Sequence, residues 1–85
     1  MNNNERIDTL NAIVDGFCAR LRQERELRGM TRAQMADFLG LYKGTYTSYE
    51  NHSIPSVTVM IQIAKKLGRS LDYLCGLDDT KGEAK

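Results

Sequence analysis

Apolar residues recur along the chain at intervals of three and four, which is the spacing of one helical face. The first series occupies the N-terminal quarter of the chain and consists of Ile7, Leu10, Val14, Phe17 and Leu21. A segment rich in Arg and Glu follows, and Gly29 then supplies a stop signal for a helix. The pattern therefore predicts one long first helix that ends near residue 29.

Two short helices are predicted next. Thr31 and Gln34 have the spacing of a capping box, in which each side chain bonds the backbone of the other residue, and Gly40 breaks this second helix after about two turns. Its expected buried residues are Met35, Ala36 and Leu39. The third helix runs to Asn51, because the segment that leads to Pro55 cannot easily continue it. Its apolar pattern comprises Leu41, Thr45, Tyr46 and Tyr49.

Two more helices complete the predicted set. Ser56 is the expected N-cap of the fourth helix and Ser70 that of the fifth, with Gly68 between them. The fourth helix is expected to bury Val57, Met60, Ile61, Ile63, Ala64 and Leu67, and the fifth runs through Leu71, Tyr73 and Leu74. No segment alternates with a period of two, so no sheet is predicted. The C-terminal residues have too little apolar surface to stay ordered.

Composition limits what the chain can be. Its 85 residues are 41% hydrophobic and 7% aromatic, which suffices for one small domain with a modest core. No apolar run approaches the roughly 20 residues of a membrane span, so we expect a cytoplasmic protein with no membrane partner. Cys18 and Cys75 form no C-x-x-C pair and are expected to be small hydrophobes kept reduced. The net charge of +1 does not by itself indicate a nucleic-acid partner.

Residues that could carry enzyme chemistry are few. The chain has one histidine, no phosphate-binding loop and no cluster of metal ligands. His52 is more simply a turn residue and Cys75 a core residue. We therefore expect no enzymatic activity, no metal, no cofactor and no small-molecule ligand.

Small residues at the junction of the second and third helices permit a steep packing angle. Ala36 lies four residues before Gly40, and Tyr46 would close the wedge from the other side. With the flanking apolar positions, these residues are similar to a helix-turn-helix pattern. The longer segments RLRQERELRGMTRAQMADFLG, TYTSYEN and PSVTVMIQIAKKLGRSLDYLCGL resemble the five-helix domain of the Cro/C1, or XRE, family of transcriptional regulators.

The resemblance implies an all-α fold, a compact five-helix lambda-repressor-like DNA-binding domain with an extended N-terminal helical segment. The expected organisation is a helical extension at residues 1–16, a Cro/C1-type helix-turn-helix domain at 17–77 and a disordered tail at 78–85.

In this family an arginine late in the first helix commonly pairs with a glutamate at the end of the recognition helix. The matching positions here are Arg25 and Glu50, so the resemblance implies a partly buried ion pair. The alternative is that Arg25 belongs to a solvated run of charges, where pairs are worth only a few tenths of a kcal/mol. That run consists of Arg20, Arg22, Glu24, Arg25, Glu26 and Arg28. If the buried pair is present, replacing Glu50 by alanine should destabilise the fold, whereas replacing Glu24 should not.

The resemblance also implies sequence-specific binding of double-stranded DNA, with the third helix in the major groove. The residues that would face base edges are Lys43, Gly44, Thr47 and Ser48. Lys43 is the strongest candidate for a base contact, because an ammonium group matches the O6 and N7 acceptors of guanine. Phosphate contacts would come from Thr31, Arg32, Tyr42, Asn51 and Ser53. Tyr42 stands where the family usually has a capping Ser or Thr, so this cap is expected to be weaker or made by water.

The charges between residues 30 and 60 sum to zero, so two or three phosphate contacts per subunit would give only modest affinity. A homodimer on a palindromic operator would double those contacts. The candidate dimer surface is the N-terminal heptad pattern, with Ile7, Leu10 and Val14. Alternatively, Ile7 to Val14 folds against the same subunit. The function favoured is that of a repressor, and the other candidate is an antitoxin-like or adaptor module that binds protein on the same scaffold.

Overall fold

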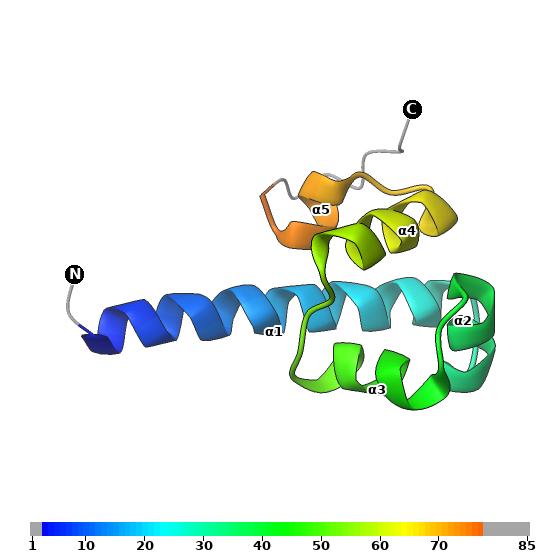
Figure 1. The fold of residues 1–85 in the computed structure, drawn as a ribbon, viewed down its shortest axis with the longest axis horizontal. Helices are drawn as coiled ribbons and strands as arrows, with labels where there is room; N and C mark the ends of the chain where they lie inside the picture. Colours follow the sequence, from blue (N-terminus) through cyan, green and yellow to red (C-terminus); the bar gives the residue numbers. More distant parts are fainter. Residues whose placement is uncertain (1–2, 78–85) are drawn as a thin grey trace.

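The computed structural model describes residues 3–77 and consists of helices connected by short loops (Figure 1). In chain order these are α1 (Asn3–Leu27), α2 (Arg32–Leu39), α3 (Lys43–Asn51), α4 (Val57–Leu67) and α5 (Leu71–Cys75). No strand occurs among the described residues. The predicted all-α, five-helix fold is thereby confirmed, while the predicted tail at 78–85 lies outside the described residues.

The helix starts follow the predicted capping chemistry. At α2, the Gln34 N–H donates to the Thr31 hydroxyl at 3.1 Å, and the Thr31 N–H donates to the Gln34 side-chain oxygen at 2.8 Å. This pair satisfies two backbone groups and confirms the capping box. The side chains of Ser56 and Ser70 likewise accept hydrogen bonds from the first turns of α4 and α5. Polar residues thus fix where three of the helices begin.

The core surrounds the C-terminal half of α1. Figure 1 shows α1 between α3 on one side and α4 with α5 on the other, and α1 packs against both α3 and α5. The buried core residues are Phe17, Leu21, Met35, Ala36, Leu39, Tyr46, Met60, Ile63, Ala64, Leu67, Tyr73 and Leu74. Because every helix contributes to this single cluster, the position of α3 depends on α1 behind it.

Two positions of α4 predicted to face inward, and one position in the predicted apolar pattern of α3, are exposed instead. Val57, the first residue of α4, and Ile61, which lies about 100° around the helix from the buried Met60, are both exposed. Thr45 is also exposed, since it lies about 100° around α3 from the fully buried Tyr46. The prediction was wrong at Val57 and Ile61 because it took apolar character as a sign of burial.

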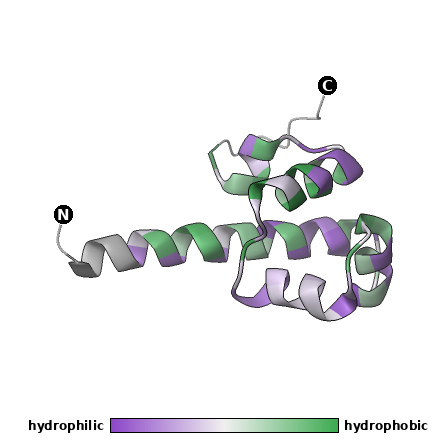
Figure 2. Ribbon diagram, in the orientation of Figure 1, coloured by the Kyte–Doolittle hydropathy of each residue, from purple (hydrophilic) through white to green (hydrophobic). Residues whose placement is uncertain are grey.

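The N-terminal stretch of α1 projects beyond the other helices (Figure 1). Here Leu10 is 56% exposed and Ile13 is 48% exposed, and Figure 2 shows hydrophobic residues on this stretch. Val14 is half-buried, and the side chain of Ile7 lies outside the described part of the structure. The helix continues without a break through Gly16, so the predicted boundary between residues 16 and 17 falls inside one helix.

Candidate nucleic-acid interface

α2 and α3 are joined by a tight turn. Gly40 adopts the left-handed conformation, with φ at 75°, and the Leu41 N–H donates to the Ala36 carbonyl at 2.8 Å. Ala36 and Tyr46 are buried at the point where the two helices pack together. The Gln62 side-chain amide of α4 donates to the Leu39 carbonyl at 2.8 Å and holds the end of α2. The buried Ala36 and the left-handed Gly40 thus lie at the junction of these two helices.

The outer face of α3 is polar. Lys43, Gly44, Thr45 and Asn51 are exposed, while Thr47 and Ser48 are half-buried. The Ser48 hydroxyl donates to the Gly44 carbonyl at 3.2 Å, so what it offers to a ligand is mainly its acceptor lone pairs. Thr45 joins the exposed set although the sequence pattern did not assign it to this face. The exposure of Thr45 could have been predicted from its neighbour Tyr46, because a residue next to a core position on a helix points away from the buried side.

The candidate phosphate-binding residues outside α3 differ in which groups they can donate. Tyr42 is 87% exposed and its side chain makes no cap hydrogen bond. This agrees with the weaker cap expected where Tyr replaces the usual Ser or Thr. Ser53 is half-buried, and its N–H donates to the Ser48 carbonyl at 3.1 Å, which leaves the hydroxyl for an outside contact. The N–H and the hydroxyl oxygen of Thr31 are both used in the capping box. Arg32, the first residue of α2, is exposed.

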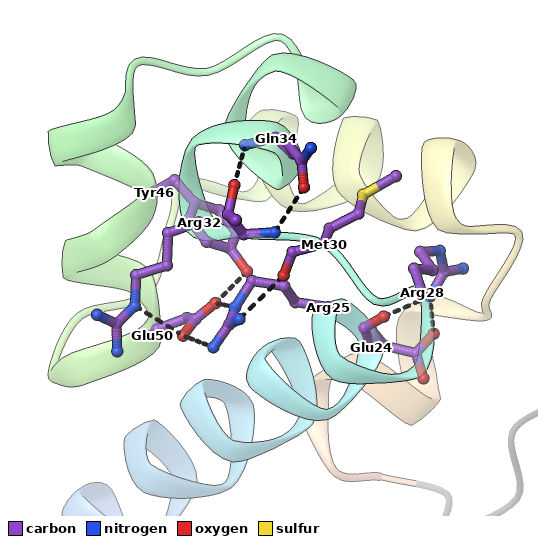
Figure 3. Close-up of polar contacts among 9 residues, drawn as sticks. Glu24, Arg25, Arg28, Met30, Arg32, Gln34, Tyr46 and Glu50 are labelled. Carbon is purple, nitrogen blue, oxygen red and sulfur yellow. Dashed lines mark hydrogen bonds and ion pairs between the residues drawn. The ribbon is translucent and has the colours of Figure 1, made fainter.

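Behind this face, a buried carboxylate connects three helices (Figure 3). Glu50 of α3 is 1% exposed, and the structure brings Arg25 of α1 against it, with Arg25 Nε at 2.7 Å from Glu50 Oε2 and Nη2 at 3.3 Å from Oε1. The Tyr46 hydroxyl donates to Oε2, and Arg32 Nε donates to Oε1 at 3.3 Å. Arg25 Nη1 donates to the Met30 carbonyl at 3.1 Å. We call Arg25, Arg32, Tyr46 and Glu50 the Glu50 cluster.

The Glu50 cluster keeps its carboxylate charged. Burial acts to raise the pKa of Glu50, but hydrogen bonds from Arg25 and Tyr46 and the charge of Arg25 outweigh it, so the pKa lies below its ordinary value of 4.5. Burial and the hydrogen bond to Glu50 raise the pKa of Tyr46, which therefore stays protonated as a donor. The hydrogen bond to Glu50 raises the pKa of Arg25. The back of α3 is thus anchored by charge-assisted hydrogen bonds.

A second buried carboxylate was missed by the sequence prediction. Glu24, which was assigned to a solvated run of charges, is fully buried. It accepts hydrogen bonds from Arg28 Nη1 at 2.9 Å, Arg69 Nε at 2.8 Å and the Tyr73 hydroxyl at 3.4 Å. The prediction was wrong because position 24 follows Phe17 and Leu21 at helical spacing and shares their core-facing side. That spacing was the available signal. We call Glu24, Arg28, Arg69 and Tyr73 the Glu24 cluster.

The Glu24 cluster joins α1 to the segment between α4 and α5. Arg28 Nη2 donates to the Leu67 carbonyl at 2.9 Å, so the same guanidinium binds Glu24 and the end of α4. Burial acts to raise the pKa of Glu24, but hydrogen bonds from Arg69 and Arg28 hold it below its ordinary value of 4.5. Burial and the charge of Glu24 raise the pKa of Tyr73. This cluster lies apart from α3 and serves the fold.

Other kinds of site receive little support from the described residues. Within residues 3–77, no group of three or more His, Cys, Asp or Glu side chains could hold a metal ion. Across the same range, no helix combines the length and the apolar character needed to cross a membrane. Cys18 is buried, Cys75 is half-buried, and both thiols are free. Burial raises the pKa of each, which disfavours the reactive thiolate.

The short α2, the tight turn at Gly40 and the polar outer face of an internally anchored α3 define a helix-turn-helix protein. Residues 21–74 match the family model described as "Helix-turn-helix". The chain belongs to this family, in its Cro/C1-type form, and the predicted resemblance is confirmed. These are DNA-binding domains and not enzymes.

Three relatives are similar over most of the chain. An "Uncharacterized HTH-type transcriptional regulator YobD" of Bacillus subtilis is 36% identical over 64 residues, or 74% of this chain and 57% of that protein. The "Cryptic phage CTXphi transcriptional repressor RstR" of Vibrio cholerae is 38% identical over 67% of this chain and 52% of that protein. A second Bacillus subtilis regulator, YqaE, is 39% identical over 68% of this chain and 51% of that protein. The chain therefore spans about half the length of these relatives, and no solved structure matches it.

Proposed function

We propose that this protein is a sequence-specific regulator of transcription that binds double-stranded DNA as a homodimer and acts as a repressor. The observation that carries the proposal is the two-sided character of α3. Its inner side is fixed to α1 and α2 through Glu50, while Lys43, Thr45 and Asn51 are exposed on its outer side. A helix anchored from behind with a polar outer face suits insertion into the major groove. The match to a relative described as a transcriptional repressor supports repression.

The residues of this interface fall into two groups, those that contact base edges and those that contact phosphate groups. Lys43, in the first turn of α3, supplies the ammonium group for a guanine edge. The half-buried Thr47 and Ser48 offer hydroxyls with weak base preference, and Gly44 lets the DNA approach the backbone. Phosphates are bound by the flanking polar residues Thr31, Arg32, Tyr42, Asn51 and Ser53. At Thr31 the hydroxyl hydrogen is the group that remains for this contact, since its N–H is used in the capping box.

Selection of bound sequences from a random duplex pool, at two salt concentrations, tests this function. We expect the wild-type protein to enrich a palindromic sequence. Lys43→Ala should weaken binding to that sequence and relax the preference at one base position per half-site, at a cost of about 1–3 kcal/mol. The reason is that a donor to one base edge is lost while the fold is untouched at this exposed position.

Lys66→Ala is the matched control, because it removes the same charge from an exposed position on α4. It should keep the wild-type sequence preference. If the wild-type protein binds every duplex equally and only through salt-sensitive contacts, or binds none, DNA readout is absent. That result would favour the protein-binding adaptor instead.

The dimer surface in this proposal is the projecting stretch of α1. Leu10 and Ile13 supply apolar surface that the subunit itself leaves exposed. Beside them, a hollow between α1 and α5 is lined by Ala12, Gly16, Arg20 and Cys75 among others. A second copy of α1 matches this surface, and Ile7 and Val14 would extend it.

Sedimentation at micromolar concentration tests the dimer surface. The wild-type protein should sediment with the mass of a dimer, and Leu10→Glu and Ile13→Glu should each shift it to the monomer by placing a charge in the apolar contact. Both substitutions are at exposed positions, so thermal unfolding of the monomer should change little. Asn11→Glu adds the same charge at another exposed position of this stretch and should keep the dimer. A monomeric wild-type protein, or dimers that survive both substitutions, would remove α1 from the interface.

A further inference from the structure

Arg32 differs from Arg25 in how its guanidinium is used. Arg25 engages Glu50 through Nε and Nη2 and the Met30 carbonyl through Nη1, so all three of its nitrogens have protein acceptors. Arg32 contacts Glu50 through Nε alone. Its side chain is 47% exposed, compared with 16% for Arg25. The two terminal nitrogens of Arg32 therefore remain for an outside acceptor.

The Glu50 cluster has an excess of positive charge, and this excess is exposed at Arg32. Two guanidinium groups and one carboxylate give the cluster a net charge of +1, with Tyr46 neutral. Arg25 is mostly buried, so the surplus reaches solvent at Arg32. Figure 3 shows the Arg32 guanidinium at the outer edge of the cluster, with its terminal nitrogens pointing away from Glu50. The Glu50 carboxylate thus binds Arg32 through Nε and leaves the two terminal nitrogens of Arg32 for another acceptor.

We propose that Glu50 is a positioning residue for DNA binding, which fixes Arg32 through Nε so that its two terminal nitrogens bind one phosphate group of the DNA backbone. This inference rests on the proposed function and assigns Glu50 a second role beyond stability. A guanidinium suits it because its planar donors can bind a carboxylate at one edge and a phosphate at another. An ammonium group concentrates its charge at one nitrogen and cannot serve both acceptors with the same geometry.

Fixing the side chain matters because a long, exposed arginine loses rotamer freedom when it binds a phosphate. In this arrangement Glu50 has already ordered Arg32 before DNA arrives. The arginine also lies at the first residue of α2, where the helix dipole favours an anion. The contact fixes the register of the domain on the duplex and carries no base preference.

The test measures the affinity of the selected duplex over a series of salt concentrations. Arg32→Gln should weaken binding about tenfold per subunit and reduce the slope of log K against log salt by about 0.9 per subunit, because one phosphate contact is lost. Arg32→Lys should also weaken binding several-fold although it keeps the charge. In a Glu50→Gln background, held well below its unfolding temperature, Arg32→Gln should cost clearly less than in the wild-type protein.

Arg22→Gln is the control, since it removes an equal charge from an exposed position of α1 and should leave affinity and slope close to wild type. Wild-type affinity in Arg32→Lys would overturn the proposal, because charge alone would then suffice. An equal cost of Arg32→Gln in both backgrounds would do the same. If the wild-type protein selects no duplex at all, the proposed function itself fails, and that result is distinct from either of these.

Discussion

Glu50→Ala is expected to lower the free energy of unfolding by about 3–5 kcal/mol, because it leaves a buried guanidinium and a buried phenol without their acceptor. Arg25 Nε and the Tyr46 hydroxyl both donate to this carboxylate, which is 1% exposed. For a domain of this size, such a loss lowers the melting temperature by about 12 °C or more. Thermal unfolding followed by circular dichroism measures the change.

Glu26→Ala is the matched control, since it removes a carboxylate from an exposed position of α1 next to Arg25. It should unfold within about 0.5 kcal/mol of wild type. Equal melting temperatures for Glu50→Ala and Glu26→Ala would show that the Glu50 cluster contributes nothing to stability.

Glu24→Ala is expected to destabilise the protein by a similar amount, about 3–5 kcal/mol at neutral pH. Arg28, Arg69 and Tyr73 would all lose their shared acceptor, and the connection of α1 to the segment after α4 would loosen. Because the pKa of Glu24 is depressed in the folded protein, the unfolded chain binds its proton at a higher pH. The difference between wild type and variant should therefore be fully present above the ordinary value of 4.5 and should narrow as the pH falls below it.

Denaturant unfolding at a series of pH values measures this difference, with Gln23→Ala, an exposed neighbour on α1, as the control. A variant as stable as wild type at neutral pH would mean that Glu24 behaves as a solvated residue. A difference that grows in acid would contradict the depressed pKa.

Local chemistry made much of the fold predictable from the sequence. The capping box at Thr31 depends on residues only three positions apart, and the left-handed turn at Gly40 depends on one glycine. Neither needs information from distant parts of the chain. The buried side of α2 followed from helical spacing alone, and the five-helix order followed from the caps between the segments.

Burial of charge and the limits of each apolar stripe were harder to predict. Glu24 reads as solvated because its neighbours are charged, and its partner Arg69 lies 45 residues away in the sequence. Val57 is predicted to be buried because it is apolar, although it is 69% exposed at the first residue of α4. The hydrogen bond from the exposed Arg32 in α2 to Glu50 in α3 is also not evident from the sequence pattern. Each of these depends on how separate helices pack, and spacing within one segment does not report it.

The unbroken course of α1 has a mechanical consequence. The helix carries both the projecting apolar stretch and Arg25, through which α3 is fastened. One continuous helix therefore fixes the orientation of any molecule bound to the projecting stretch relative to α3. One residue inserted between Ile13 and Phe17 would rotate that stretch by about 100° and advance it by about 1.5 Å. In the proposed dimer, the length of this one helix would therefore set the distance and the angle between the two copies of α3.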